Sequence, residues 1–161
     1  MPDARFDIRP ARTGDDYEGV ARLFNAYVLS LGIDLGFQDF ASELASLPGK
    51  YAPPEGELLL ARDSEGEPVG CVAVRPIEPE GCCEMKRLYV APSGRGLGLG
   101  KALMNAILVE AERIGYREMR LDTLPKLVEA LALYTKGGFV PIPPYYDTPL
   151  PETIFLGRRL L

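Results

Sequence analysis

The sequence predicts a mixed α/β fold, in which helices cover both faces of a single sheet. Residues 82–114 show this best, because a strand-like run is followed at once by a glycine-rich loop and a helical pattern. Over the whole chain the patterns follow the order β-α-α-β-β-β-α-β-α-β-β, which amounts to seven strands and four helices. No repeat, linker or change of composition divides the 161 residues, so we expect one domain over residues 1–161.

The first part of the chain reads as one strand and two helices. A short strand is expected at residues 6–9. Thr13 can cap a helix whose first turn carries two aspartates, and apolar residues at helical spacing continue that helix to about residue 30. Gly32 then ends it. A second helix is expected at 38–47, before a loop rich in proline and glycine.

The middle of the chain reads as three strands and a helix. Two strands are expected at 57–63 and 68–75, joined by a hairpin turn. The central strand, 84–90, is followed by the glycine loop and by a helix that continues to about Ile114.

The last part contains one more strand–helix unit and two strands. The strand is expected at 118–123, and Pro125 suits the start of a helix that Gly137 ends. Strands at 139–142 and 153–160 then flank a proline-rich loop.

Composition excludes several classes of protein. The chain is 47% hydrophobic and 25% charged, as soluble globular domains are, and no apolar run approaches the roughly 20 residues of a membrane helix. A net charge of -5 argues against nucleic acid as a partner. The N-terminus lacks the apolar stretch of a signal peptide, so we expect a cytoplasmic protein without a membrane partner.

The absence of histidine limits the chemistry. A chain with no histidine cannot use Ser-His or Cys-His catalysis, and it lacks the commonest metal ligand, so we expect no metal. The three cysteines, Cys71, Cys82 and Cys83, have neither the spacing of a zinc site nor an even number for disulfides. We expect them to be buried in the core.

The glycine loop is suited to an anion. Glycines at 94, 96, 98 and 100 allow a tight turn and a close approach of the backbone to a partner. The first turn of the following helix offers free N–H groups, and Arg95 and Lys101 add positive charge on either side. These features predict a phosphate-binding loop.

Two common phosphate loops do not fit this loop. A Walker A loop needs glycine where Arg95 stands, and Ser or Thr where Ala102 stands. The dinucleotide pattern GxGxxG, begun at Gly94 or at Gly96, fails at its last glycine. A nucleotide-binding protein with a different phosphate loop is therefore a disfavoured alternative.

The remaining pattern, Arg95-x-x-Gly98-x-Gly100, resembles the acyl-CoA pyrophosphate loop of the GCN5-related N-acetyltransferase (GNAT) family. Leu88-Tyr89-Val90-x-Pro92 resembles the segment before that loop, and Leu133-Tyr134-x-x-x-Gly138-Phe139 resembles the family's second signature. The order of elements is also the family's order. The resemblance implies a GNAT-like fold: a central, mixed, mostly antiparallel seven-stranded sheet flanked by four helices. The alternative is an ordinary strand-to-helix turn rich in glycine.

The resemblance also implies that acetyl-CoA is the co-substrate. Loop N–H groups would hold its pyrophosphate, and the central strand would pair with its pantetheine arm, which requires that strand to separate from the next one. One N–H of the strand would face the thioester carbonyl as an oxyanion donor. Thr123 occupies a region where family members often have Asn. The residues implied to contact the cofactor are Leu88, Tyr89, Val90, Arg95, Gly96, Leu97, Gly98, Leu99, Gly100, Lys101 and Thr123.

Tyr134 is the candidate for the general acid, since it matches the tyrosine of the second signature. A phenol with a pKa near 10 stays protonated at neutral pH and can donate its proton to a leaving thiolate. The alternative is a core tyrosine at the end of an apolar helical face.

Glu84 is the candidate for the base, because some family members carry a catalytic glutamate at this point of the strand. Strand alternation places Glu84 on one face together with Lys86, Leu88 and Val90. A carboxylate beside an apolar pocket would have a raised pKa. The alternatives are an ion pair with Lys86, or another structural ion pair, with water as the base.

The resemblance places acceptor recognition on the first two helices and on the loop between the last strands. These segments contain Tyr27, Tyr145, Tyr146 and Asp147. Ring faces and a carboxylate could hold a cation, or the loop could pack in a homodimer; the chain could also be a monomer.

We therefore expect an N-acyltransferase that moves acetyl from acetyl-CoA to a primary amine by direct attack in a ternary complex. The amine could belong to a small molecule or to a peptide or protein. The alternative is a non-catalytic acyl-CoA binding or sensing module on the same fold, although such a module needs neither Tyr134 nor Glu84.

Overall fold

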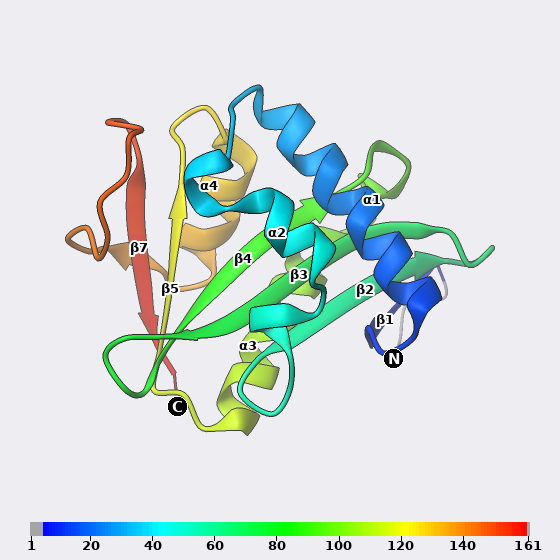
Figure 1. Ribbon diagram of the computed structural model, residues 1–161, viewed down its shortest axis with the longest axis horizontal. Helices are drawn as coiled ribbons and strands as arrows, with labels where there is room; N and C mark the ends of the chain where they lie inside the picture. Colours follow the sequence, from blue (N-terminus) through cyan, green and yellow to red (C-terminus); the bar gives the residue numbers. More distant parts are fainter. Residues whose placement is uncertain (1–4, 161) are drawn as a thin grey trace.

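The computed structural model describes residues 5–160, which form a seven-stranded sheet with helices on both faces (Figure 1). The strands are β1 (Phe6–Pro10), β2 (Glu57–Asp63), β3 (Pro68–Ile77), β4 (Cys82–Val90), β5 (Glu118–Thr123), β6 (Val140–Pro141) and β7 (Ile154–Arg159). The main helices are α1 (Gly14–Leu31), α2 (Phe40–Ala45), α3 (Leu99–Ile114) and α4 (Val128–Lys136). No helix within residues 5–160 is long and apolar enough to cross a membrane.

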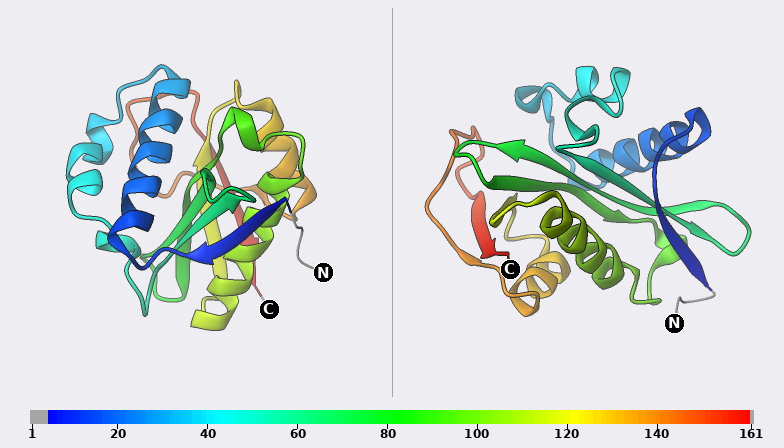
Figure 2. Two further views of the ribbon diagram at one scale, coloured as in Figure 1. Left: turned by 90° about the vertical axis from the view of Figure 1, so that its right-hand side faces the viewer. Right: turned by 90° about the horizontal axis from the view of Figure 1, so that it is seen from below.

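The sheet is mixed and mostly antiparallel, as the sequence predicted. Its strand order is β1-β2-β3-β4-β5-β7-β6, and only the pair of β4 and β5 is parallel. Figure 2 shows α1 and α2 on one face, here called the α1 face, and α3 and α4 on the other, the α3 face. The larger core lies on the α3 face. The smaller core lies on the α1 face and contains the fully buried Phe24 and Tyr51.

Local signals fix the ends of α1. The N–H of Asp16 donates to Thr13 Oγ1 at 3.1 Å, and the N–H of Thr13 donates to the Asp16 carboxylate at 3.2 Å. This reciprocal pair is a capping box. Gly32 has φ 68°, a conformation that glycine adopts without strain, and it ends the helix as predicted.

Three elements differ from the prediction in extent or start, and the ends of β1, β3, β4 and β7 also shift by one or two residues. Helix α2 is shorter than 38–47, because Asp39 has φ 56° and separates a 3-10 turn, Gly36–Gln38, from the helix. Helix α4 begins at Val128 rather than at Pro125. Strand β6 contains only Val140–Pro141, where the sequence predicted 139–142.

Strand β4 contains a β-bulge at Arg87. Its φ is 60°, and the pairing with β3 shifts there. Because the bulge adds a residue, Leu88 and Val90 pack against the core on the α3 face, whereas Glu84 and Lys86 bond to groups on the α1 face. The prediction that these four side chains share one face is therefore wrong, since strict alternation ends at the bulge.

The bulged residue is held by a buried ion pair that joins the sheet to α2. Arg87 Nε and Nη2 each donate to a Glu43 carboxylate oxygen at 3.0 Å, and the two side chains are only 4% and 3% exposed. Burial by itself would raise the pKa of Glu43, but the hydrogen bonds and charge of Arg87 outweigh it, and the pKa is lowered. The carboxylate therefore stays charged beside the guanidinium.

Removal of one partner of this pair should be costly. We expect Glu43→Leu to lower the free energy of unfolding by about 3–5 kcal/mol, because Arg87 stays buried without its counter-charge. The double variant Glu43→Leu/Arg87→Met should recover most of that loss. Urea unfolding measures both, with Glu110→Leu as the control, because Glu110 pairs with an exposed Arg113 and should cost at most about 1 kcal/mol. Equal losses for Glu43→Leu and Glu110→Leu would contradict the prediction.

Candidate active site

A groove with a cavity volume of about 710 Å³ lies along the second half of β4, the glycine loop and the first turn of α3, facing α4 and the end of α1. Most of the residues predicted to hold the cofactor line this groove: Leu88, Tyr89, Val90, Arg95, Gly96, Gly98, Leu99, Gly100 and Lys101. Leu97 and Thr123 were predicted with them but do not line the groove; Thr123 lies in a neighbouring cavity.

The glycine loop leaves its backbone N–H groups unpaired. From Gly96 to Lys101, no N–H donates to a backbone carbonyl of residues 5–160. Gly96 and Gly98 have φ of 82° and 75°, and a Cβ at either position would meet no atom within 4 Å. The exposed side chains of Arg95 and Lys101 add two positive charges. Free N–H groups at a helix N-terminus, open space and two cations fit an anionic diphosphate.

The two parallel strands separate where the groove begins. Strands β4 and β5 pair only from Cys82/Glu118 to Glu84/Arg120, after which their ribbons diverge in Figure 1. Beyond Glu84, β4 stays paired with β3 on its other side up to Val90. The β5-facing backbone groups of Leu88, Tyr89 and Val90 therefore have no partner strand, and they can pair with an extended amide chain laid in the groove. The predicted separation of the strands is confirmed.

Tyr134 lies in the wall of the groove, near the end of α4. Its side chain is 8% exposed, and its ring meets that of Phe139 edge to face at 5.9 Å between centroids. Its hydroxyl makes no hydrogen bond within the described part of the chain. Burial raises the pKa of Tyr134, with smaller contributions from Tyr27 and the Asp122 carboxylate, so the phenol keeps its proton at neutral pH.

Glu84 is buried in a hydrogen-bonded cluster outside the groove. Arg75 Nε donates to its Oε1 at 2.9 Å, and the Tyr145 hydroxyl donates to its Oε2 at 2.6 Å. Burial favours a higher pKa, but the charges of Lys86 and Arg75 and the two hydrogen bonds outweigh it, and the pKa of Glu84 is lowered. The expected rise in pKa is therefore wrong. These contacts favour the structural ion pair over the base, whose role stays a prediction.

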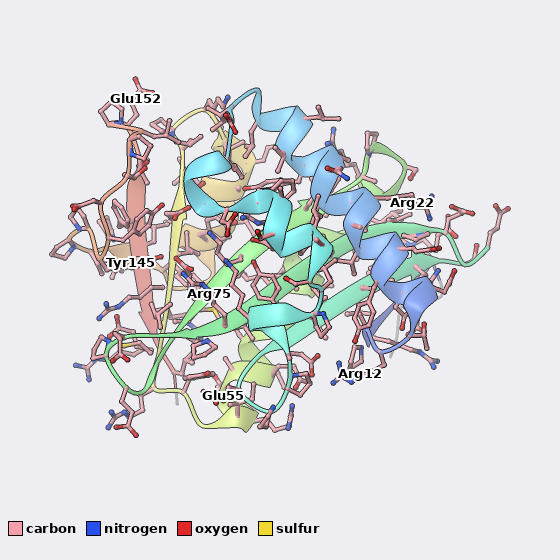
Figure 3. All side chains as sticks on the ribbon, viewed as in Figure 1. Arg12, Arg22, Glu55, Arg75, Tyr145 and Glu152 are labelled. Carbon is pink, nitrogen blue, oxygen red and sulfur yellow. The ribbon has the colours of Figure 1, made fainter. Side chains whose placement is uncertain are left out.

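The loop between β6 and β7 places two tyrosines on the α1 face and leaves its aspartate outside. Figure 3 shows Tyr145 near β5 and β7, with Arg75 on the same face. The rings of Tyr145 and Tyr146 contact each other and Phe155, and the guanidinium of Arg120 lies 5.7 Å from the centroid of Tyr145. Asp147 is exposed. The tyrosine hydroxyls donate to Glu84 and Asp122, and the cradle of two rings and a carboxylate for a cation stays a prediction.

A second, smaller cavity adjoins the groove around the end of β5. Tyr27 and Leu127 line both spaces, so these two side chains form their shared boundary, here called the junction. The smaller cavity is also lined by Asp122, Thr123 and Tyr146, among other residues. Lys126 Nζ donates to the carbonyl of Leu31, and this bond joins the end of α1 to the loop before α4 beside the junction.

Asp122 is one of the lining residues that the sequence did not indicate, as are Ser30, Lys126 and Glu129 in the groove. The signal was the alternation of β5, in which Met119 and Leu121 face the core and Arg120 and Asp122 face the other way. A carboxylate at the end of a strand that loses its parallel neighbour is a candidate for ligand contact, but only the structure shows the cavity beside it.

Residues 5–160 contain neither a cluster of metal ligands nor an exposed cysteine thiol. Within residues 5–160, no three His, Cys, Asp or Glu side chains are grouped as metal ligands. Cys71, Cys82 and Cys83 are buried free thiols, and burial raises the pKa of each. They are core residues, as expected.

Comparisons with known proteins agree with this geometry. Residues 21–139 match the model of the acetyltransferase (GNAT) family. The chain is 42% identical to an uncharacterized N-acetyltransferase of Schizosaccharomyces pombe, over 97% of this chain and 96% of that protein. An uncharacterized N-acetyltransferase of Escherichia coli is 30% identical, over 79% of this chain and 78% of that protein. A GNAT-family acetyltransferase of Staphylococcus aureus has the same fold, with a TM-score of 0.78 at 20% identity, covering 97% of this chain and 99% of that one. The chain belongs to the GNAT family of acetyltransferases.

Proposed function

We propose that the protein transfers an acetyl group from acetyl-CoA to a primary amine, by direct attack within a ternary complex. The observation that supports this most is the junction at Tyr27 and Leu127. There, a groove with the features of an acyl-CoA site meets a separate polar cavity. Donor and acceptor can thus approach the same point from two sides, without a covalent enzyme intermediate.

The groove supplies the binding contacts for the donor. The free N–H groups from Gly96 to Lys101 would bind the diphosphate, and the unpaired edge of β4 would bind the amides of the pantetheine arm. An N–H of the same edge would donate to the thioester carbonyl, where negative charge develops during attack. Strand β4 holds that donor rigidly, because its other edge is paired with β3 as far as Val90.

Two protons must move for the reaction to complete. An alkyl ammonium with a pKa of about 10.4 is neutral in only about one molecule in 2,500 at pH 7, so deprotonation of the acceptor limits attack. The thiolate that leaves needs a proton, and the hydroxyl of Tyr134 is the donor in the wall of the groove. Its raised pKa keeps that proton available over the whole neutral range.

The first prediction tests donor binding. Gly98→Asp places a side chain and a negative charge where the diphosphate would lie, so acetyl-CoA affinity should fall by at least about 10²-fold. Gly66→Asp is the matched control, since Gly66 also has a positive φ, 84°, and open space, but lies in the turn between β2 and β3. Calorimetry on both folded variants measures the effect. Unchanged affinity in Gly98→Asp would exclude the loop as the diphosphate site.

The second prediction tests the acid. Tyr134→Phe removes one hydroxyl and keeps the ring against Phe139, so kcat should fall by about 10²–10⁴-fold, with acetyl-CoA affinity within a few-fold of the parent protein. Tyr116→Phe is the control, because its hydroxyl bonds to the Glu55 carbonyl away from the groove. Release of free thiol, read with a panel of amines, gives kcat. A loss of less than about threefold, outside the usual range for acid catalysis, would make Tyr134 a packing residue.

The third prediction separates the two roles considered for Glu84. Its pKa is lower in the folded protein, so its stabilisation is present above the ordinary value of about 4.3 and is lost as the pH falls through the folded value. Glu84→Gln should therefore reduce stability at pH 7 and flatten the decline of stability below about pH 5.

Turnover by the same variant decides the base role. We expect kcat per folded molecule within about threefold of the parent, since both oxygens of Glu84 already accept hydrogen bonds. Urea unfolding as a function of pH and thiol release are the measurements, with the exposed Glu152→Gln as the control. A fall in kcat of about 10² or more would restore Glu84 as the base.

A further inference from the structure

We propose that Asp122 binds the acceptor nitrogen in the cavity at the end of β5 and removes its proton as the new amide bond forms. The geometry further points to an unhindered primary amine as the acceptor. This inference rests on the proposed acetyl transfer, and it assigns the amine end of that reaction to residues of β5 and of the loop before β7.

The first observation is a buried hydroxyl without a partner. Thr123 is 6% exposed, and its Oγ1 is buried and makes no hydrogen bond within residues 5–160. A buried polar atom normally finds a partner, because leaving it unpaired is unfavourable. Thr123 lines the small cavity. A threonine hydroxyl can accept a hydrogen bond from an N–H, so an amine bound against Thr123 would satisfy it once rotation about χ1 turns Oγ1 toward the cavity.

The second observation is a carboxylate with one oxygen held and the other open. The hydroxyl of Tyr146 donates to Asp122 Oδ2 at 2.5 Å, which fixes the orientation of the carboxylate. Asp122 Oδ1 makes no hydrogen bond or ion pair in the described part of the chain. The two buried carboxylates of this face differ from the half-buried Asp122, since Glu43 and Glu84 each have both oxygens occupied. Asp122 is thus the one of these three that is open to a ligand.

The third observation is the size of the cavity. Its volume is about 30 Å³, which is room for about two water-sized groups. An NH₂ or NH₃⁺ group has the size of a water molecule and fits. The amine nitrogen and the carbon next to it already fill this volume, so a methyl group on either atom would exceed it. The cavity therefore favours an unbranched primary amine.

The fourth observation is the position of Asp122 relative to both tyrosines. Burial raises the pKa of Tyr27 to about 12, and the Asp122 carboxylate contributes to that rise, as it does for Tyr134. Asp122 also lines the small cavity together with Tyr27 and Leu127, the two residues that line the groove as well, so its charge lies beside the point where the amine would meet the thioester. A carboxylate there attracts an ammonium group and stabilises the positive charge that develops on the attacking nitrogen.

The proton transfers balance. The ammonium first loses one proton to water, and the neutral nitrogen keeps an N–H directed at Asp122. The nitrogen then forms a bond to the carbonyl carbon, its second proton moves to Asp122 Oδ1, and the carbon–sulfur bond breaks. The sulfur takes the proton of Tyr134, and the proton on Asp122 returns to the Tyr134 oxygen through water. The sum is ammonium plus thioester giving amide, thiol and one proton in solution.

The test compares Asp122→Asn with Tyr146→Phe. Asp122→Asn keeps an oxygen for the Tyr146 hydroxyl but removes the charge and the proton acceptor, so kcat/KM for a primary amine should fall by at least about 10²-fold. Tyr146→Phe removes the hydrogen bond to Asp122 Oδ2 and keeps the carboxylate, so its kcat/KM should fall by at most about tenfold. Asp7→Asn, an exposed carboxylate on β1, is the control. The assay reads thiol release from acetyl-CoA with unbranched primary amines, each paired with its N-methyl and α-methyl analogue, which should react at least about tenfold more slowly.

The outcomes separate this inference from the proposed function. The proposed function would be overturned if calorimetry showed that the parent protein does not bind acetyl-CoA. It would also be overturned if the protein bound acetyl-CoA but turned over none of the amines. Turnover that Asp122→Asn leaves within about threefold, far below an acid–base effect, would overturn the role of Asp122 alone. If Asp122 has only a structural role, Tyr146→Phe should lower Tm more than Asp122→Asn, and neither variant should change turnover per folded molecule. That result would also overturn the role of Asp122. Equal rates for the primary and branched amines would overturn the assignment of the acceptor class.

Discussion

The separation of β4 from β5 is the constraint on which the rest of the structure depends. The two strands pair over three residues only and then diverge, which leaves one edge of β4 without a partner in the middle of the sheet. An unpaired edge inside a sheet is normally unfavourable. Here one side of β4 remains in the antiparallel ladder with β3, so the strand stays fixed while its other edge is free. Groove and cavity both adjoin this opening.

Charged residues hold the opening in place from the α1 face. The bulge at Arg87 turns its side chain toward α2, where Glu43 binds it through two hydrogen bonds. Glu84 ties β4 to Arg75 of β3 and, through Tyr145, to the loop before β7. Such buried ion pairs contribute little net stability, because desolvation offsets attraction, but each fixes the position of an element relative to its neighbours. Their role here is to hold α2 and the loop before β7 against β4 on the α1 face.

The sequence predicted those parts of the site that depend on local pattern. The glycine loop, the helix after it and the strand before it form one continuous segment, so their geometry follows from residues that are neighbours in the chain. Tyr134 could be placed by its signature, and the strand separation followed from the same resemblance. The predicted elements were also found, with errors mainly at α2, α4 and β6, whose ends depend on single residues such as Asp39.

The parts that could not be predicted depend on contacts between distant segments. Nothing near Arg87 in the sequence marks a bulge, since its partner Glu43 is 44 residues away. The environment of Glu84 is set by Tyr145, 61 residues away, which is why a carboxylate expected beside an apolar pocket has two hydrogen bonds and a lowered pKa instead. Asp122 was overlooked for the same reason, because the cavity beside it is built by α1 and by the loop that contains Tyr146.

The unpaired polar groups around the opening also form a consistent set. The N–H groups from Gly96 to Lys101 are donors at one end of the groove, and the hydroxyl of Tyr134 is a donor in its wall. Thr123 Oγ1 and Asp122 Oδ1 are acceptors in the cavity beyond the junction. A thioester carrying a diphosphate supplies acceptors, and an amine supplies donors, so the order of unpaired groups along the opening matches the order of the two substrates in the proposed reaction. The fold thus leaves these groups unpaired beside the opening, and it buries and pairs the neighbouring charges of Glu43, Glu84 and Arg87.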